Sequence, residues 1–571
     1  MGWNMEKNDI ICAVAEGLGS NGEGIIRHEG VTFFVPACLP GEKVRFKVLK
    51  IKDKIGYGKI EEILTPAEER ARPKCPAFLR CGGCRLQHVE YSAQLKMKGN
   101  MVRDCLKKIG GIDFDVPQAI KSDFEYGYRN KLQLPVGVDK NGEDVIGFYA
   151  ERSHRIIPID SCAIHPDWAE KLIAVIKSFM RECRVHGYDE TKKTGTLRHI
   201  VAREIAGNFI FTLVVADRKI QGLDRLISLL QAKFPSFSLY LNVNAKDTNV
   251  IFGEEFRLLY GEPTFESVEQ GIRYEAGPVT FLQVNENVRT KLYQAAVKSV
   301  TGEGDEVVID AYSGGGLLTA MLAKKAKRVY GIELEKEAVA CADSLKAKNR
   351  LKNMTNICGY VEEHLSEVMQ KEKDEKVRLI LDPPRAGIAR SVVKALCESG
   401  IPKLTIISCN PATLARDLGI LTGTLIEKDG ELIKGDGNGA YEIVSVQPYD
   451  MFPQTRHVET LVQLSHKKPD TNLEVALDFE NEGVEQSLAE LETLVKSRES
   501  VRVTYKMIQE YIEEKYGFKV HTAYIAEVKR SLGLPMYDAP NAVEELKKPR
   551  QHPTEQMVKA IKDALKYFEI I

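Results

Sequence analysis

The sequence has no apolar run long enough to span a membrane, no signal-peptide pattern at its start and no excess of charge of one sign. Its 571 residues include 80 Lys and Arg and 81 Asp and Glu, which gives a net charge of −1. Bulk charge therefore does not predict a nucleic-acid partner, although a basic face can lie opposite acidic segments. Since nothing predicts a leader or a membrane span, we expect a cytoplasmic monomer with no membrane partner.

Cysteine is also sparse, because 12 cysteines in 571 residues are too few for a disulfide scaffold. Three of them, Cys75, Cys81 and Cys84, lie within ten residues of sequence. Close thiolates of this kind favour a soft metal or an iron–sulfur centre. Such a centre needs a fourth ligand, for which Cys162 is the candidate. Four cysteines also satisfy zinc, although the second CxxC pair that is typical of zinc ribbons is absent.

The order of patterns along the chain predicts a multidomain α/β protein. Residues 1–65 alternate short β-like runs with glycine turns, which predicts a small OB-like β-barrel. Residues 66–280 mix helical and strand patterns, as in an α+β domain. Residues 281–466 alternate strands and helices, as in a doubly wound, Rossmann-like sheet. Residues 467–494 are rich in Asp and Glu and predict an acidic linker, and residues 495–571 predict a helical extension.

A glycine-rich loop follows the predicted strand that ends at Asp310. The three glycines 314–316, just after Tyr312, allow the backbone to approach a ligand closely before a helix begins. Glu333 ends the next predicted strand, a spacing that suits a carboxylate accepting hydrogen bonds from ribose hydroxyls. Together these features predict a nucleotide-type cofactor site, with an ordinary strand-to-helix turn as the alternative.

Two later predicted strands are each followed by a residue that can take part in catalysis. These residues lie at the edge where open α/β sheets bind ligands. Asp382 precedes two prolines, whose rings fix the backbone and hold the carboxylate at this edge. Cys409 precedes a turn at Asn410 and Pro411 that should expose its sulfur, and a thiolate there is a competent nucleophile. Glu459 precedes an apolar strand and is either a general base at the same edge or a surface carboxylate.

In this order and spacing, the motifs resemble those of the RNA uracil-5-methyltransferases that use S-adenosylmethionine, and most of all the 23S ribosomal RNA branch. The resemblance spans residues 1–465, through residues 280–285, 310–316, 382–385, 408–411 and 457–459. It implies that Cys409 adds to C6 of the target uracil, that C5 takes the methyl group and that Glu459 removes the C5 proton. The cofactor contacts that it implies are Gln283, Tyr312, Glu333 and Asp382.

The resemblance also implies functions for the N-terminal part. It implies a 4Fe–4S cluster on Cys75, Cys81, Cys84 and Cys162, with a structural or RNA-organising role, and a TRAM domain for the β-barrel. The expected partner is RNA, and barrel and cluster together favour ribosomal RNA over transfer RNA. Six cations of the barrel would follow the phosphates or else form a solvated strand face: Lys43, Arg45, Lys47, Lys50, Lys52 and Lys54.

Other functions remain open from sequence. A radical methylthiotransferase also joins a TRAM domain to an iron–sulfur cluster, but with a different cysteine spacing. An amino-directed methyltransferase usually has an aromatic residue where Arg385 follows the two prolines. A non-catalytic RNA-binding scaffold would not need Cys409 and Glu459. Beyond residue 466 the resemblance ends, and the helices there are either a contact through Lys529 and Arg530 or a packing module.

Overall fold

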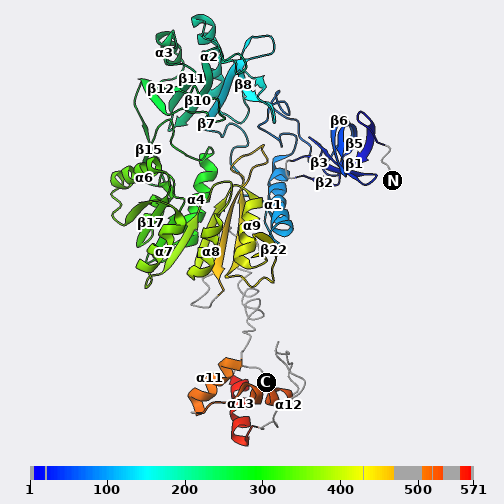
Figure 1. The fold of residues 1–571 in the computed structure, drawn as a ribbon, viewed down its shortest axis with the longest axis vertical. Coiled ribbons are helices and arrows are strands. Elements are labelled where there is room, and N and C mark those ends of the chain that lie inside the picture. Colours follow the sequence, from blue (N-terminus) through cyan, green and yellow to red (C-terminus); the bar gives the residue numbers. More distant parts are fainter. Residues whose placement is uncertain are drawn as a thin grey trace, which may run out of the picture. The chain divides into compact units, whose positions relative to one another are not determined.

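A computed structural model describes residues 5–19, 22–428, 430–467, 505–516, 518–531 and 553–567. The chain forms two compact units, Met1–Thr471 and Asn472–Ile571 (Figure 1). The predicted acidic linker lies outside the described residues, except for Lys467. No helix in the described ranges is long and apolar enough to cross a membrane.

Six strands form the N-terminal sheet in the order β1-β5-β6-β4-β3-β2. Side chains alternate between the faces of β5, so that Val44 and Phe46 are buried while Lys43 and Arg45 are exposed. The rings of Phe33 and Phe46 have centroids 5.2 Å apart in the core beneath. The strands are β1 (Ile10–Val14), β2 (Gly17–Leu18), β3 (Gly24–His28), β4 (Val31–Val35), β5 (Lys43–Lys52) and β6 (Ile55–Thr65).

The central sheet has seven strands in the order β13-β12-β11-β10-β7-β8-β9. Helices α2 (Trp168–Cys183) and α3 (Leu223–Gln231) pack on it, and α2 buries Leu172, Ile176 and Phe179 at helical spacing. The strands are β7 (Lys131–Val138), β8 (Asp144–Tyr149), β9 (Ile156–Pro158), β10 (Leu197–Ile205), β11 (Asn208–Val215), β12 (Phe237–Val243) and β13 (Glu255–Tyr260), and a hairpin of β14 (Phe265–Glu269) and β15 (Ile272–Ala276) follows.

The third sheet also has seven strands, in the order β18-β17-β16-β19-β20-β24-β23. The first five run parallel, whereas β24 pairs antiparallel with β20 and with β23, so the predicted doubly wound sheet is mixed at one side. Its strands are β16 (Val307–Ala311), β17 (Arg328–Glu333), β18 (Met354–Cys358), β19 (Val377–Leu381), β20 (Lys403–Ser408), β23 (Tyr441–Tyr449) and β24 (Glu459–His466).

Helices cover both faces of this third sheet, because its parallel strands are apolar on both sides. Along β16, Val307 and Ile309 join the core on one face, and Val308 joins the core on the other. One face carries α4 (Glu286–Val300), α5 (Leu317–Ala323) and α6 (Lys336–Lys348), and the other carries α7 (Val361–Lys371), α8 (Arg390–Ser399) and α9 (Pro411–Thr422). A hairpin of β21 (Leu425–Lys428) and β22 (Glu431–Lys434) follows α9.

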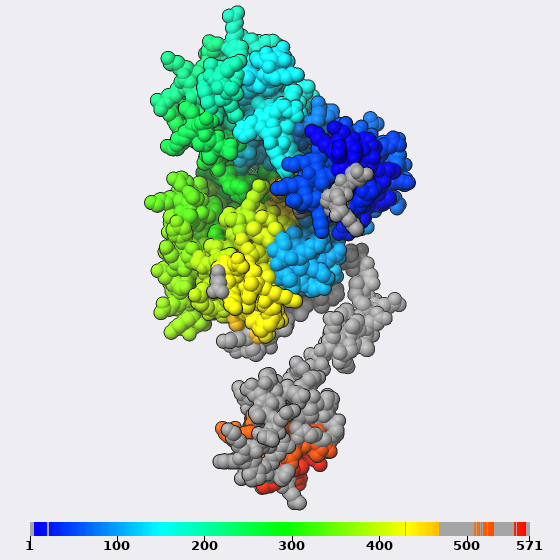
Figure 2. Space-filling view, turned by 45° about the vertical axis from the view of Figure 1, so that its right-hand side comes forward, coloured from blue at the N-terminus to red at the C-terminus, as the bar shows by residue number. Residues whose placement is uncertain are grey.

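Helix α1 (Tyr91–Lys108) packs on the third sheet, although its sequence position falls in the predicted central domain. Val102 and Leu106 join the core that α9 covers, and Lys98 forms a buried ion pair with Asp450 just after β23. The N-terminal sheet lies beside α1 (Figure 2, dark blue and light blue), where Leu39 packs in a small apolar cluster with residues 86–93. The segment after the N-terminal sheet therefore connects that sheet to the third sheet.

The described residues of the second unit form three helices. They are α11 (Tyr505–Tyr516), α12 (Thr522–Ser531) and α13 (Glu555–Tyr567). Ile508, Ile512, Ile525 and Ile561 are buried among them, which shows that these helices share a small core. The Asp563 carboxylate accepts hydrogen bonds from three side chains of α11, namely Tyr511, Lys515 and Tyr516.

Candidate active site

The predicted functional residues meet at one edge of the third sheet, where its parallel strands end. Glu333 is the last residue of β17, and Asp382 and Cys409 directly follow β19 and β20, as the sequence predicts. Glu459 lies at the same edge because β24 runs antiparallel to the other strands and Glu459 is its first residue. Ser408 and Thr460 are partners in the β20–β24 ladder, so Cys409 and Glu459 lie just beyond that pair.

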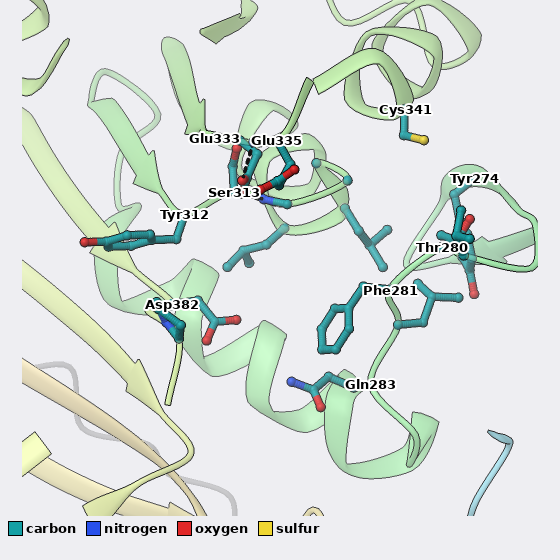
Figure 3. A pocket seen from close by; sticks show the side chains of 18 of the residues that line it. Tyr274, Thr280, Phe281, Gln283, Tyr312, Ser313, Glu333, Glu335, Cys341 and Asp382 are labelled. Carbon is teal, nitrogen blue, oxygen red and sulfur yellow. Dashed lines mark hydrogen bonds between the residues drawn. The ribbon is translucent and has the colours of Figure 1, made fainter. Parts of the chain in front are cut away.

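A cavity of about 1200 Å³ opens at this edge, and all six predicted cofactor and catalytic residues line it. They are Gln283, Tyr312, Glu333, Asp382, Cys409 and Glu459. Single-ligand pockets are typically about 300–1,000 Å³, so this volume has room for a nucleoside cofactor and a second group. In Figure 3 the Gln283 amide and the Asp382 carboxylate point into the same space from opposite sides.

The glycine loop and Glu333 form one end of the cavity. The Glu333 carboxylate accepts hydrogen bonds from the backbone N–H of Gly314 at 2.8 Å and of Glu335 at 3.0 Å (Figure 3). Gly316 has a φ of 81°, and a Cβ there would lie 2.7 Å from the Cβ of Ala342, so only glycine fits between the loop and α6. The loop therefore fixes the carboxylate beside Gly314 and Gly315, where no atom would lie within 4 Å of an added Cβ, and this open backbone suits a ribose.

Asp310 lies beneath this loop and holds it to α5. Its carboxylate accepts a 2.6 Å hydrogen bond from the Thr319 hydroxyl. Burial, with smaller contributions from the charges of Asp382 and Glu333, raises the pKa of Asp310 to about 7 against the opposing effect of the Thr319 hydrogen bond. Tyr312, two residues on, takes a φ of 65°, which is rare for a residue with a bulky side chain and turns the chain sharply out of β16.

The Cys409 thiol and the carboxyl groups of Glu459 and Asp382 line the other end of the cavity. Burial raises the pKa of Cys409, the charge of Glu459 raises it further, and Arg385 opposes both effects. Burial also holds the pKa of Glu459 well above its usual range, and it raises the pKa of Asp382 to about 7. Groups with pKa values shifted in this way are typical of acid–base sites, and a thiol beside a strong proton acceptor suits nucleophilic catalysis.

The turn after Cys409 is fixed by Asn410, which precedes α9 as its N-cap. The Asn410 side-chain oxygen accepts a hydrogen bond of 3.1 Å from the N–H of Ala412, and its amide donates one of 3.1 Å to the carbonyl of Arg385. Pro411 occupies the first turn of the helix, where its missing N–H costs nothing. The predicted turn is therefore confirmed, and it also joins the Cys409 loop to the Asp382 loop.

The loop before Glu459 is held by the cysteine-rich segment. The carbonyl of Gln454 accepts hydrogen bonds of 3.0 Å from the N–H groups of both Arg85 and Leu86. The side-chain amide of Gln94, in α1, donates to the side-chain oxygen of Gln454 at 3.0 Å, and the Tyr128 hydroxyl donates to the carbonyl of Pro453 at 3.0 Å. The position of Glu459 thus depends on contacts with residues 85–128.

A second cavity, of about 270 Å³, is lined by Cys75, Cys81, Cys84 and Cys162. Burial raises the pKa of Cys84 to about 11 and that of Cys162 to about 12, and it also raises the pKa of Cys81. Within the described residues, no group of three or more His, Cys, Asp or Glu side chains is placed to hold a single metal ion. The four thiols surround a shared space, which is larger than one ion needs.

Two features of the main cavity were not predicted from sequence. Phe281 is 76% exposed, and its ring enters the cavity (Figure 3). An exposed aromatic side chain beside Gln283 is a hydrophobic surface for a flat ligand group. Arg203 is 3% exposed and lines the cavity from the central sheet. No local pattern marks Arg203, because its position depends on the pairing of β10 with β7.

Known proteins are similar to most of this chain. Residues 90–467 match the family described as tRNA (Uracil-5-)-methyltransferase. A relative from Clostridium tetani, described as an uncharacterized RNA methyltransferase, is 36% identical over 465 residues, or 81% of this chain and 97% of the relative. A relative from Clostridium acetobutylicum with the same description is 38% identical over 464 residues, or 80% and 97%.

Among solved structures, this chain is similar to the Pyrococcus abyssi tRNA (uracil-54, C5)-methyltransferase in complex with S-adenosyl-L-homocysteine. The two have a TM-score of 0.62 and 25% sequence identity. The match covers 79% of this chain and 99% of that one.

Proposed function

The chain belongs to the RNA uracil-5-methyltransferase family and is an S-adenosylmethionine-dependent RNA methyltransferase that acts on uracil C5, and we propose that Cys409 and Glu459 carry its chemistry on 23S ribosomal RNA. The observation that best supports this proposal is the position of both residues just beyond the Ser408–Thr460 pair, in the cavity that Glu333 also lines.

Gln283, Tyr312, Glu333 and Asp382 would hold the cofactor. S-adenosylmethionine supplies a methyl group on a positively charged sulfur. The Glu333 carboxylate, fixed by the N–H groups of Gly314 and Glu335, has the geometry to accept hydrogen bonds from ribose hydroxyls. Asp382 and Gln283 face the remaining space, where an amino acid group or the uracil edge can contact them.

Cys409 would activate the uracil ring. Uracil C5 is a poor nucleophile, so the Cys409 thiolate bonds to C6 and the electrons move to form an enolate. The enolate carbon C5 would then take the methyl group while the bond between that methyl group and the cofactor sulfur breaks, which would leave S-adenosylhomocysteine. Because burial raises the pKa of Cys409, its proton must leave during the attack. The target base must leave its stack to reach the thiol, and the cavity is large enough for it beside the cofactor.

Glu459 would complete the reaction. Its carboxylate takes the proton from C5, the C5–C6 double bond forms again, and the bond between C6 and the Cys409 sulfur breaks. A carboxylate with a raised pKa is a stronger proton acceptor than an ordinary one, and burial gives Glu459 this property. Arg385 lines the same cavity and limits the rise, so that the charged form stays accessible.

The cysteine cavity would hold a 4Fe–4S cluster on Cys75, Cys81, Cys84 and Cys162. The four thiols around 270 Å³ support a cluster over a single ion, and their buried thiolates need a positive centre to be stable. The cluster would be structural. Residues 85 and 86, just after Cys84, bond to Gln454, so a fixed cysteine loop also fixes the loop that leads to Glu459.

The N-terminal sheet would act as a TRAM-type RNA module. The cations of β5 and its following turn support this proposal, because Lys43, Lys50, Lys52 and Lys54 are exposed on one short stretch of chain. Arg45, by contrast, pairs with Glu62 at 2.7 Å and is less available to phosphate. We propose five parts of the chain: an RNA module at residues 1–65, a cluster domain at 66–280, a catalytic domain at 281–466, a linker at 467–494 and a helical extension at 495–571.

Transfer RNA is the second candidate substrate, because the similar Pyrococcus abyssi enzyme acts on tRNA. Transfer of a labelled methyl group to purified ribosomal RNA and to purified transfer RNA, followed by mapping of the modified nucleoside, separates the two. Methylation of uridine C5 in 23S RNA supports the proposal. Methylation in transfer RNA alone would replace the substrate but keep the chemistry, and a methyl group at any other atom would overturn the proposed roles of Cys409 and Glu459.

A further inference from the structure

Three cations line the main cavity, Lys131 and Arg203 from the central sheet and Arg129 from the segment just before it. Lys131 and Arg203 are direct partners in the antiparallel β7–β10 pair, so their side chains share one face of the sheet. Arg129 lies two residues before Lys131, and its Nε donates a 3.3 Å hydrogen bond to the carbonyl of Lys131. The three side chains therefore form one cluster, called the cation wall below.

The cation wall has no carboxylate partner. Among the described residues, none of the three forms an ion pair within 4.0 Å, and the Nε and Nη1 atoms of the buried Arg203 have no hydrogen-bond partner. Glu286, the carboxylate whose charge acts on Arg203, accepts from Asn130 at 3.3 Å and lies 4.0 Å from Arg289. A buried, unpaired guanidinium is costly, so this arrangement favours binding of an anion.

The charges within the wall also repel one another. Burial, together with the neighbouring charges of Arg203 and Arg129, lowers the pKa of Lys131 to about 8. Burial lowers the pKa of Arg203 to about 10, with a smaller contribution from Arg289. An anion between them would remove this repulsion. Arginine is well suited to a phosphate, because its planar fork donates two parallel hydrogen bonds to two phosphate oxygens.

We propose that Arg129, Lys131 and Arg203 bind a backbone phosphate of the RNA next to the flipped uridine. The proposal rests on the proposed function, which brings two kinds of oxyanion into the cavity, an RNA phosphate and the cofactor carboxylate. The position of the wall favours the phosphate. Gln133, two residues after Lys131, and His457, two residues before Glu459, both line the main cavity and a neighbouring third cavity, so this side of the wall lies near the end where the base reacts.

A path for the RNA strand continues beyond the wall. Gln133, two residues after Lys131 on β7, lines the main cavity and also a third cavity of about 870 Å³. Arg152 and Arg456 line that third cavity, and neither forms an ion pair with a described residue. Cations in both cavities can thus contact phosphates on either side of the flipped nucleotide, although Glu151 and Glu190 also line the third cavity.

The test uses the full-length protein with Lys131→Met and Arg203→Met, which keep length and remove charge. Lys140→Met is the matched control, because Lys140 is exposed in the turn after the same strand. For each variant, the affinity for S-adenosylhomocysteine and for a uridine-containing single-stranded RNA is measured by titration at several salt concentrations. These readouts need no turnover, so they remain interpretable even if the proposed reaction fails.

We expect each wall variant to lose RNA affinity and to reduce the slope of log K against log salt by about 0.7, the value for one phosphate contact on a single strand. Affinity for S-adenosylhomocysteine should be unchanged, which also reports a folded cavity, and Lys140→Met should match the wild type. Lost S-adenosylhomocysteine affinity with an unchanged RNA slope would assign the wall to the cofactor carboxylate and overturn the proposal. Unchanged affinity for both ligands in Lys131→Met would also overturn it, even if Arg203→Met fails to fold.

Discussion

The side-chain amide of Asn410 donates a 3.1 Å hydrogen bond to the backbone carbonyl of Arg385, and this contact joins the loop of the proposed nucleophile to the loop of Asp382. The Thr413 hydroxyl donates to the same carbonyl at 3.3 Å. Strand ends bring these loops to one edge, and the two hydrogen bonds then join the start of α9, just after Cys409, to the loop after Asp382.

Asn410→Ser should separate this contact from helix capping. Serine can still accept from the N–H of Ala412, so thermal stability should stay near that of the wild type. Without the amide, only the 3.3 Å hydrogen bond from Thr413 still joins the Cys409 loop to Arg385, and methyl transfer should fall on the order of 10- to 100-fold because the nucleophile is misplaced. Asn410→Ala should show the same loss of activity plus about 1 kcal/mol of destabilisation. Full activity of Asn410→Ser would show that the tie has no positioning role.

Cys409→Ala should abolish methyl transfer and leave the affinity for S-adenosylhomocysteine intact, because the thiol is the proposed nucleophile and contacts the base. Cys397→Ala is the control, since Cys397 lies in α8 away from the cavity lining. The two variants are compared by labelled methyl transfer and by titration. Residual turnover well above background in Cys409→Ala would rule out covalent catalysis by this residue.

Glu459→Gln should block removal of the C5 proton but not the attack of Cys409 on C6. The amide cannot take the C5 proton, so the methylated base should remain bonded to Cys409. A band of RNA–protein adduct should build up on a denaturing gel when cofactor and RNA are both present. The double variant with Cys409→Ala should show no such band. Normal turnover without an adduct would assign proton removal to another group.

The pKa of Asp382 makes a prediction about pH. Burial raises it from 3.8 to about 7, so the folded protein holds this proton more tightly than the unfolded chain does. Such a group stabilises the fold at pH values below 3.8, and the contribution is lost as the pH rises through about 7. Wild type should therefore lose stability relative to Asp382→Asn over this range in urea unfolding. Asp436→Asn is a control in which the pH dependence of stability should have the opposite sign, because hydrogen bonding with Asn438 lowers the pKa of Asp436. A difference that does not vary with pH would contradict the burial of Asp382.

Protein purified without oxygen should be brown and contain about four irons per chain if the four cysteines hold a cluster. Cys162→Ser should lose the colour and the iron, whereas Cys183→Ser should keep both, because Cys183 does not line the cysteine cavity. Iron analysis and visible absorbance provide the measurement. One zinc per chain with no visible absorbance would establish the zinc alternative instead.

Much of the site was predictable because strand ends are local features. The apolar runs before Asp382 and Cys409 end where β19 and β20 end, and Glu333 is the last residue of β17. The cavity then brings these residues together with Gln283 and Tyr312. The direction of β24 was not predictable, since an apolar run does not reveal whether it pairs parallel or antiparallel. Its antiparallel pairing is what brings its first residue to the edge.

Non-local pairings account for the other features that sequence did not predict. The pairing of Lys131 with Arg203 joins residues 72 positions apart, and no local pattern announces it. The packing of α1 on the third sheet is a similar case, because the ion pair of Lys98 with Asp450 joins residues 352 positions apart. Local patterns predicted a mixture of helices and strands over residues 66–280, but only the fold shows which elements meet.

Incubation with RNA that carries 5-fluorouridine at the target position tests the central claim most directly. Fluorine at C5 leaves no proton for Glu459 to remove, so attack by Cys409 and methyl transfer should trap the enzyme on the RNA. Intact-mass measurement should show protein plus RNA plus one methyl group, only when S-adenosylmethionine is present, and Cys409→Ala should give no adduct. Methylated RNA without any covalent complex, or an adduct that persists in Cys409→Ala, would contradict the proposed mechanism.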